Sequence, residues 1–473
     1  MHSFDISRFY PAQKEKEFVK TRSYENAQTI YTPAVHPREP YISQRELFVS
    51  PFYEREKELG GYFDNEVAGW ERALAYESNR EKLHDFLKEV PVRENEWDRR
   101  HVPYEIANAE HLAMTESAGM INLSHFAIID VEGPDAECML EYLSLAKVGG
   151  NTPEGRIIYT NFLDGKGGVH ADLTISRLGT DRYRVITGGA DGNRDWVTLR
   201  NYRDDNGLKA VIDIRTHDIA TLGLWGPEAK NALGHFVDPN EISIENFPFA
   251  TAKYLTLNLS GGKTIDVWAA RISYVGESGW EIYLNNNSEE GLALFDSLLE
   301  VGVVPVGIET YANSRRMEKS FRLQGADLES EYNACESAIE RRIVKEADFH
   351  GKAAHLAHRE EEPCAILCTM TLDSLNVSGK LRYPVGISPI IDPDTGEVPV
   401  DTKGRRSYST SMSYCPSIKK HVVMGYLPKN IAIVGKSLSL EYFNENGDGV
   451  YPMTVEIVGK GSIFDPENKR VRS

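Results

Sequence analysis

The segment Gly165–Arg177, which reads GKGGVHADLTISR, constrains the fold most, because a glycine-rich turn leads directly into a strand with one carboxylate. Apolar and polar residues alternate along it, and a period of two sends successive side chains to opposite faces of a strand. The apolar set is Val169, Ala171, Leu173 and Ile175, and the polar set is His170, Asp172, Thr174 and Ser176. The sequence therefore predicts one face in a core and Asp172 on a polar face, which is either half-solvated or part of a site.

Composition narrows the kind of partner. The 473 residues carry 53 basic and 71 acidic side chains, a formal net charge of −18. Nucleic acids and anionic membranes attract basic surfaces, so this balance argues against both as the main partner. We expect a small-molecule ligand, and a chain of this length predicts two to four domains.

The apolar runs and the cysteines predict a cytoplasmic location. No apolar run approaches the ~20 residues that cross a bilayer, and the start, MHSFDISRFYPAQKEKE, lacks the apolar core of a signal peptide. Five scattered cysteines do not fit a disulfide framework. Cys364 and Cys368 lie in an apolar run with no second pair of ligands, so we expect no metal site.

Three regions differ in their residue pattern, and together they predict an α+β fold. Residues 1–100 are predicted to form an N-terminal arm and a helical extension. The arm, residues 1–45, shows no sustained period and is expected to lie over the folded body. The extension has a short helix that starts at Pro51 and stops at Gly60, and further helical material around residues 80–90. Residues 101–355 contain two strand, Gly-Pro, helix units and a predicted hairpin, which read AIIDVEGPDAECMLEYLSL, ATLGLWGPEAKNAL and AARISYVGESGWEIYL. Residues 356–473 consist of short strands and turns that predict a small β-barrel or sandwich.

A basic cluster stands out in this acidic chain. The segment GIETYANSRRMEKSFRLQG is predicted to be an amphipathic helix, and it brings together Arg315, Arg316, Lys319 and Arg322. Such a cluster is either a solvated face or an anion pocket.

In this order, the motifs resemble the folate-binding aminomethyltransferase family, which includes the T-protein of the glycine-cleavage system. The segments that carry the resemblance are GGVHADLTISR, GLWGPEAK, VGESGWE and RRMEKSFRLQGADL. A closer likeness is to the folate-binding half of dimethylglycine and sarcosine dehydrogenases, through Ser50–Tyr76, TGGADGNRDW and the tail FDPENKRVRS.

This resemblance implies a three-domain cloverleaf of antiparallel sheets with flanking helices and a C-terminal β-barrel-like domain. It also implies tetrahydrofolate as the cofactor, with Asp172 at the family's catalytic aspartate. Glu281, Tyr274 and Glu277 fall in the hairpin that holds the pterin ring, whose adjacent N–H groups suit a carboxylate. Tyr159 is expected to stack on the pterin or to donate a proton.

The chain departs from the T-protein at three positions. The adjacent aspartates of the T-protein become Ala171-Asp172, its asparagine after the next strand becomes Gly188, and its folate-tail arginine aligns near Ala312. Arg316 is therefore the candidate that replaces the folate-tail arginine. The first two departures point away from glycine cleavage.

Our leading hypothesis is a tetrahydrofolate-dependent demethylase, because no GxGxxG follows an N-terminal strand and the chain looks like the folate part standing alone. The expected donor is a small methoxylated substrate, such as an aromatic acid, or an onium compound. Asp172 would accept a proton from the folate, and His170, on the same predicted face, or Tyr159 would protonate a leaving oxygen. The alternatives are a glycine-cleavage aminomethyltransferase, the folate subunit of a flavin-dependent N-demethylase with a flavoprotein partner, and a folate-binding regulator.

Overall fold

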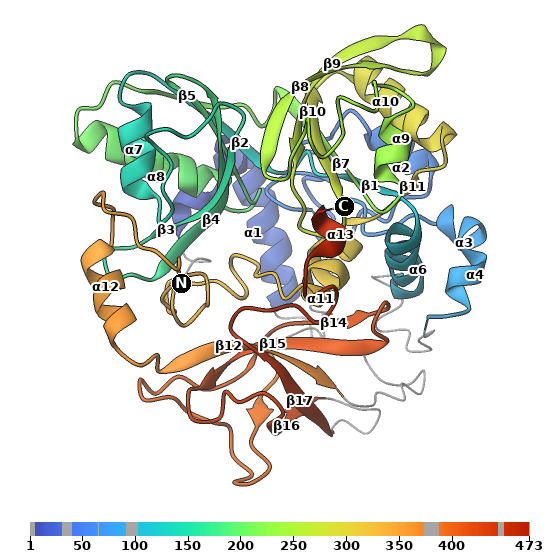
Figure 1. Cartoon of the computed structure of the whole chain (residues 1–473). Coiled ribbons are helices and arrows are strands. Elements are labelled where there is room, and N and C mark those ends of the chain that lie inside the picture. The colour runs from blue at the N-terminus through green and yellow to red at the C-terminus, as the bar shows by residue number, and fades with distance from the viewer. Residues whose placement is uncertain are drawn as a thin grey trace.

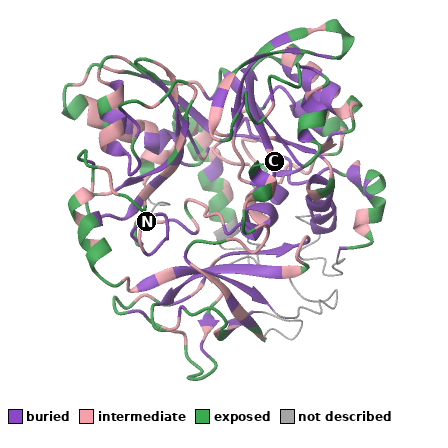
Figure 2. Cartoon of the chain, in the orientation of Figure 1, coloured by how far each residue is buried: buried purple, intermediate pink, exposed green. Residues whose placement is uncertain are grey.

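The computed structural model describes residues 5–30, 40–64, 66–90, 103–372, 387–442 and 449–472. Three lobes, each built on one sheet, surround a centre where α11 (Arg316–Glu318) and α13 (Lys469–Arg472) lie (Figure 1). Buried residues follow the strands of all three sheets, and exposed residues gather on the outer helices (Figure 2). The predicted α+β cloverleaf is confirmed, whereas domain boundaries at residues 100 and 355 stay a prediction.

The first lobe carries the sheet that contains the opening segment. In spatial order its antiparallel strands are β3 (Ile157–Leu163), β4 (Val169–Gly179), β5 (Arg182–Thr187), β2 (Ala127–Glu132) and β6 (Val211–Ile214). Two helices follow strands of this sheet, α7 (Ala136–Leu143) and α8 (Gly192–Asp205). Met139 of α7 and Leu199 of α8 share a core with Leu173 of β4. The helices therefore cover the apolar face of β4, and its polar face is turned toward the centre.

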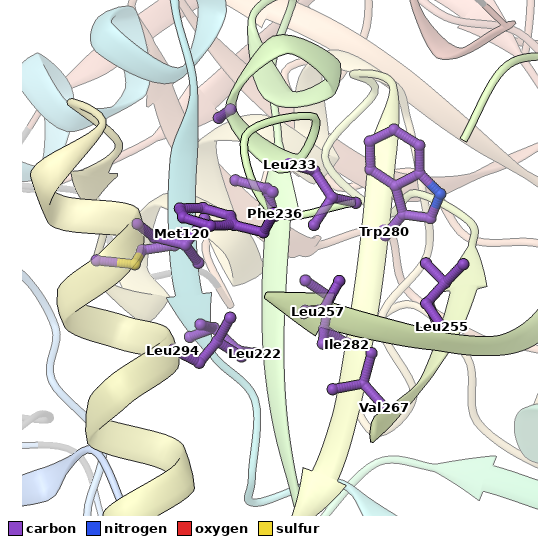
Figure 3. Packing of buried hydrophobic residues seen from close by; sticks show 14 of the residues in the cluster. Met120, Leu222, Leu233, Phe236, Leu255, Leu257, Val267, Trp280, Ile282 and Leu294 are labelled. Atoms are coloured by element: carbon purple, nitrogen blue, oxygen red, sulfur yellow. The ribbon is translucent and has the colours of Figure 1, made fainter. Parts of the chain in front are cut away.

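The second lobe is a six-stranded sheet that contains the predicted hairpin. In spatial order its strands are β11 (Val304–Pro305), β1 (Gly119–Asn122), β7 (Ile219–Trp225), β10 (Gly279–Asn285), β9 (Thr264–Arg271) and β8 (Thr251–Asn258). The helices beside it are α9 (Ala229–Leu233), η4 (Ser260–Gly262) and α10 (Ser288–Glu300). Leu222, Leu257 and Ile282 from three strands pack together with Leu294 of α10 (Figure 3). The antiparallel pairing of β9 with β10 confirms the hairpin.

The third lobe is the C-terminal sheet. In spatial order its strands are β13 (Ile390–Ile391), β16 (Ser437–Glu441), β17 (Val450–Val458), β12 (Ala365–Leu372), β15 (Lys420–Pro428) and β14 (Ser409–Cys415). The two edges meet beside β13, because the amide of Ile387 donates to the carbonyl oxygen of Ser409 at 2.8 Å. This contact bends the sheet into the predicted barrel-like form. The helix α12 (Lys352–Glu360) leads into this lobe.

The N-terminal region contains the helices that the sequence predicts near residues 51–60 and 80–90, and its arm is more helical than the sequence pattern indicates. Its helices are η2 (Ile6–Arg8), η3 (Pro11–Lys14), α1 (Lys16–Ile30), α2 (Tyr53–Glu58), α3 (Asn79–Lys82), α4 (His84–Leu87) and α6 (Tyr104–Glu116). The expectation of an arm without helical structure is wrong for α1, whose only buried side chain among those described is Arg22. A helix that buries so little has no apolar stripe, so a search for periodicity misses it. The arm does lie on the body, since the Tyr10 hydroxyl donates to the Gly189 carbonyl oxygen at 3.1 Å.

The predicted basic helix takes an unusual form. Residues Thr310–Arg315 form the π-helix η5, which continues as the single turn α11. π-Helical turns are rare and occur often at functional sites. None of the helices in the described part of the chain has the length and apolar character needed to cross a membrane.

Candidate active site

The strand β4 presents Asp172 as its alternation predicts. Val169, Ala171, Leu173 and Ile175 are all buried, whereas His170, Asp172 and Thr174 are partly exposed. Ser176 departs from the pattern because it is buried as well. The apolar side of β4 thus anchors the strand in the core, and Asp172 faces the centre of the molecule.

The register of β3 against β4 gives Asp172 its first partner. Asn161 lies directly opposite Asp172, and its Nδ2 donates to Asp172 Oδ1 at 2.8 Å. Phe162 pairs with Ala171 and Leu163 with Val169, so His170 is the extra residue of a β-bulge. The bulge shifts the pairing by one residue and thereby brings Asn161 to the carboxylate.

Tyr159 is the second partner of this carboxylate. Its hydroxyl donates a hydrogen bond to Asp172, while the residue as a whole keeps 45% of its surface exposed. Burial raises the pKa of Asp172 to about 6, although the bonds from Tyr159 and Asn161 and the charge of Arg322 act in the other direction. A carboxylate with a pKa near neutral that accepts hydrogen bonds from neutral groups is suited to accept a proton.

His170 faces α8 and not Asp172. Its Nε2 lies 3.2 Å from Thr198 Oγ1, and the described contacts include none between His170 and Asp172. Burial, assisted by the charge of Arg194, lowers the pKa of His170, so the ring is neutral at pH 7. A second carboxylate, Asp195, reaches the same region but forms a 2.9 Å ion pair with Arg194.

Glu281 lies in the middle of β10, on the opposite side of the centre. Its side chain is buried and accepts a hydrogen bond from the Tyr283 hydroxyl. Burial raises the pKa of Glu281 to about 7, although the Tyr283 bond opposes the shift. Like Asp172, this carboxylate is bonded by a neutral donor and has no cationic partner among the described residues.

Tyrosine rings connect the two carboxylates. The ring centroids of Tyr274 and Tyr311 are 5.2 Å apart, and the Tyr274 hydroxyl donates to the Arg322 carbonyl oxygen at 2.7 Å. Burial raises the pKa of both tyrosines, and the charge of Asp172 adds to the shift of Tyr274 and that of Glu281 to the shift of Tyr311. The group that results, which we call the central cluster, consists of Asp172, Asn161, Tyr159, Tyr274, Tyr311 and Glu281.

Two other predicted site residues lie in a different environment. Glu277 is buried and paired with Arg315 at 2.5 Å and with Arg470 at 2.9 Å. Arg316 is buried and paired with Asp327 at 2.5 Å. We call the group formed by Glu277, Arg315, Arg470, Arg316 and Asp327 the arginine cluster.

The arginine cluster corrects one sequence-based interpretation. The basic side chains of this segment are not a solvated face, because Arg315, Arg316 and Lys319 are all buried. Arg316 also donates to Ser411 Oγ at 2.7 Å and to the Ala312 carbonyl oxygen at 2.7 Å. These bonds hold Arg316 within the protein, and its contact with a folate tail stays a prediction.

Comparison with known proteins places the chain in a family. The model of the GCVT N-terminal domain matches residues 52–347, which is more than half of the chain. The chain belongs to the aminomethyltransferase family. Residues 1–50 are also similar to the central domain of FAD-dependent oxidoreductases.

Two relatives with the same sequence identity cover the chain to different extents. The mitochondrial dimethylglycine dehydrogenase of Mus musculus is 28% identical over 431 residues, which cover 85% of this chain and 44% of that protein. The chain therefore spans less than half the length of this relative. The aminomethyltransferase of Symbiobacterium thermophilum is 28% identical over 347 residues, which cover 72% of this chain and 86% of that protein.

A solved structure has the same fold. The glycine cleavage system aminomethyltransferase T from Bartonella henselae superposes with a TM-score of 0.67 and 22% sequence identity, covering 87% of this chain and 97% of that chain. Membership of the aminomethyltransferase family implies a one-carbon transferase, and tetrahydrofolate is the cofactor expected for that family.

Proposed function

We propose that this protein is a demethylase that transfers a one-carbon unit from a small methylated substrate to tetrahydrofolate. The observation that carries the proposal is the environment of Asp172. This carboxylate accepts hydrogen bonds from two neutral groups, the Asn161 amide and the hydroxyl of the exposed Tyr159. Its pKa of about 6 leaves it ionised at neutral pH, so it can take up a proton from a bound amine. We place the reaction in the cytoplasm, in line with five free cysteines.

The central cluster suits a flat heterocycle with N–H donors. Asp172 and Glu281 can each accept from paired N–H groups, and the Tyr159 surface is open to stacking. Next to β4, Gln324 Nε2 donates to the His170 carbonyl oxygen, and Gln324 Oε1 is a buried acceptor with no partner among the described residues. These side chains, with Tyr274, would hold tetrahydrofolate, which when bound supplies an amine nitrogen that takes up the one-carbon unit.

The proposed donor is a methoxylated substrate, with an aromatic acid as the first choice, or an onium compound. The bond from the methyl carbon to oxygen or sulfur breaks, and the leaving atom keeps the electron pair. A leaving oxygen needs a proton, which we assign to His170 or Tyr159, whereas a sulfonium sulfur leaves as a neutral sulfide. Asp172 takes the proton released at the acceptor nitrogen. Most of the rate would come from alignment of nitrogen, carbon and leaving atom.

The test is formation of a one-carbon folate, identified by mass, across a panel of methoxybenzoates, dimethylsulfonium acids and methylated amines. A second arm offers a lipoylated aminomethyl carrier and measures release of ammonia. We expect methyl-folate from an ether or onium donor, and we expect Asp172→Asn to reduce its formation. Turnover of the lipoylated carrier alone would favour the glycine-cleavage reaction, and no folate product from any donor would contradict the proposal.

A second candidate function is the folate side of a flavin-dependent N-demethylase. It is supported by the similarity of residues 1–50 to an FAD-dependent oxidoreductase domain and by the similarity of the chain to a dimethylglycine dehydrogenase. Large apolar side chains of this segment are also exposed, namely Ile6, Val19, Tyr24, Tyr41, Ile42 and Val49. A flavoprotein partner that covers this segment would remove that surface from water.

These two candidates differ in the product. An N-demethylase needs a flavoprotein to oxidise the methylated amine and yields methylene-folate, whereas the direct demethylase yields methyl-folate without a flavoprotein. Methylene-folate that forms from dimethylglycine or sarcosine only after a flavoprotein is added would favour the second candidate. Methyl-folate formed by the isolated chain would exclude it.

A further inference from the structure

The C-terminal tail, residues 461–472, leaves the third lobe and returns to the centre of the molecule. Figure 1 shows its helix α13 beside α11, between the second and third lobes. The amides of Ile463 and Phe464 donate to the carbonyl oxygen of Glu318, at 3.2 and 3.0 Å. The tail is therefore bonded to the end of α11 before α13 begins.

Lys319 anchors the tail a second time. Its Nζ donates to the Asp465 carbonyl oxygen at 2.7 Å and to Asn468 Oδ1 at 2.8 Å, and Lys319 itself is buried. Asp465 in turn accepts from the Lys469 amide at 2.9 Å, which fixes the start of α13. These bonds determine where the side chain of Arg470 points.

Arg470 reaches the turn between β9 and β10. Its Nε lies 2.9 Å from each carboxylate oxygen of Glu277, whose side chain is only 1% exposed. Arg315 binds the same carboxylate at 2.5 Å and donates from Nε to the Val275 carbonyl oxygen at 3.0 Å. Burial raises the pKa of Glu277 despite both arginines, so the ionised carboxylate depends on them.

The same turn carries Tyr274 of the central cluster. Tyr274 lies three residues before Glu277, and between them Gly276 has a positive φ of 78°. A Cβ on Gly276 would lie 2.6 Å from Cγ of Lys319, so the turn packs directly on the side chain that anchors the tail. Both the conformation and the position of the turn thus depend on residues that the tail holds.

We propose that the C-terminal tail is a positioning strap, in which Arg470 acts through Glu277 to hold Tyr274 against the ligand. Arg470 is a positioning residue, because it contacts the turn and not the reacting groups. This inference depends on the proposed function only in that tetrahydrofolate is taken as the ligand. Loss of Arg470 would leave Glu277 with Arg315 alone, and Arg315 also faces Glu318 at 3.3 Å. The carboxylate of Glu277 would then keep one of its two arginine partners.

The test compares Arg470→Gln, Arg470→Lys and the control Arg472→Gln, which changes an exposed arginine of the same helix. We expect Arg470→Gln to raise KM for tetrahydrofolate roughly 10-fold, the size expected for losing a charged hydrogen bond, with kcat changed far less. Arg470→Lys should recover part of the loss because it restores the charge, and Arg472→Gln should behave as the wild type. An unchanged KM in folded Arg470→Gln, or equal losses in all three variants, would overturn the strap.

Hydrogen exchange of the turn separates this inference from the proposed function. Without any ligand, amides of residues 273–278 should exchange faster in Arg470→Gln than in Arg472→Gln. If tetrahydrofolate fails to bind the wild type, the proposed function fails, and the exchange comparison still decides the strap. Equal exchange in the two variants would show that Arg470 does not hold the turn.

Discussion

Two sets of acids lie side by side in this molecule, and they are stabilised in different ways. Asp172 and Glu281 in the central cluster accept hydrogen bonds from tyrosine and asparagine. Glu277 and Asp327 in the arginine cluster form ion pairs with buried arginines. The family resemblance placed Asp172, Glu281 and Glu277 in one ligand site. In the structure the first two accept from neutral groups, and Glu277 pairs with arginines.

The two kinds of partner determine which acids are available to a ligand. An acid paired with arginine is neutralised within the protein, and removing either partner leaves an uncompensated buried charge. An acid bonded by neutral donors has no cation to neutralise it and keeps oxygen lone pairs that can still accept. The central cluster is therefore built for proton transfer and binding, and the arginine cluster is built to hold the second and third lobes together.

The largest effect that would break this comparison is on the reaction rate. Asp172→Asn keeps the size of the side chain but removes the base, so we expect one-carbon transfer to fall by roughly 10²–10⁴-fold. Mass-detected folate product is the measurement. Asp213→Asn, an exposed acid on the edge strand of the same sheet, is the matched control and should keep the wild-type rate. A loss of less than about threefold in Asp172→Asn would show that Asp172 is not the base.

The next effect is on stability and belongs to the arginine cluster. Asp327→Asn leaves Arg316 as an unpaired buried cation, and we expect the free energy of unfolding to fall by about 3–5 kcal/mol. Urea denaturation measures this change. A loss below about 1 kcal/mol, the range of exposed ion pairs, would contradict a structural role for this pair.

Asp172→Asn should raise the free energy of unfolding, whereas Asp327→Asn should lower it. The folded-state pKa of about 6 lies above the ordinary value of 3.8, so stability is lost as the pH rises through this window. Asparagine does not ionise, so at pH 8 the variant should gain up to about 3 kcal/mol in free energy of unfolding. Near pH 4 the gain should approach zero. Urea denaturation of the wild type and the variant at pH 8 and pH 4 measures this gain. An equal gain at both pH values would show that the raised pKa of Asp172 does not cause the difference in stability.

Local patterns predicted the elements but not the partners of Asp172. Alternation along β4 and the Gly-Glu-Ser-Gly turn before β10 depend on neighbouring residues only, and both predictions held. Leu163 lies opposite Val169 where β3 and β4 begin to pair. If the pairing continued from there without a bulge, Thr160 would lie opposite Asp172. The bulge at His170 brings Asn161 there instead, and no residue of the turn signals it.

The fate of the basic cluster depends on contacts far apart in the chain. Arg315 meets a carboxylate 38 residues away, and that carboxylate meets Arg470 a further 193 residues along. A cluster of positive charge in the sequence therefore does not reveal whether water or buried acids surround it. The sequence patterns likewise missed Tyr311, which lies in a π-helix that periodicity does not predict.

The smallest effect concerns His170. Its Nε2 faces Thr198 and its pKa is lowered, so it is a weak proton donor at neutral pH. We expect His170→Gln to reduce transfer from an ether donor by less than about tenfold and to leave an onium donor unaffected. Rates with the two donors, measured side by side, test this. A loss equal to that of Asp172→Asn would restore His170 as the principal acid.

The pH dependence of kcat/KM tests the central claim most directly, because it reports whether ionised Asp172 is required. We expect kcat/KM of the wild type to fall about tenfold per pH unit below a pKa of about 6, as Asp172 becomes protonated. The residual activity of Asp172→Asn should lack this acidic limb. A wild-type profile that stays flat from about pH 5 to 8, or the same limb in Asp172→Asn, would contradict the assignment of Asp172 as the base.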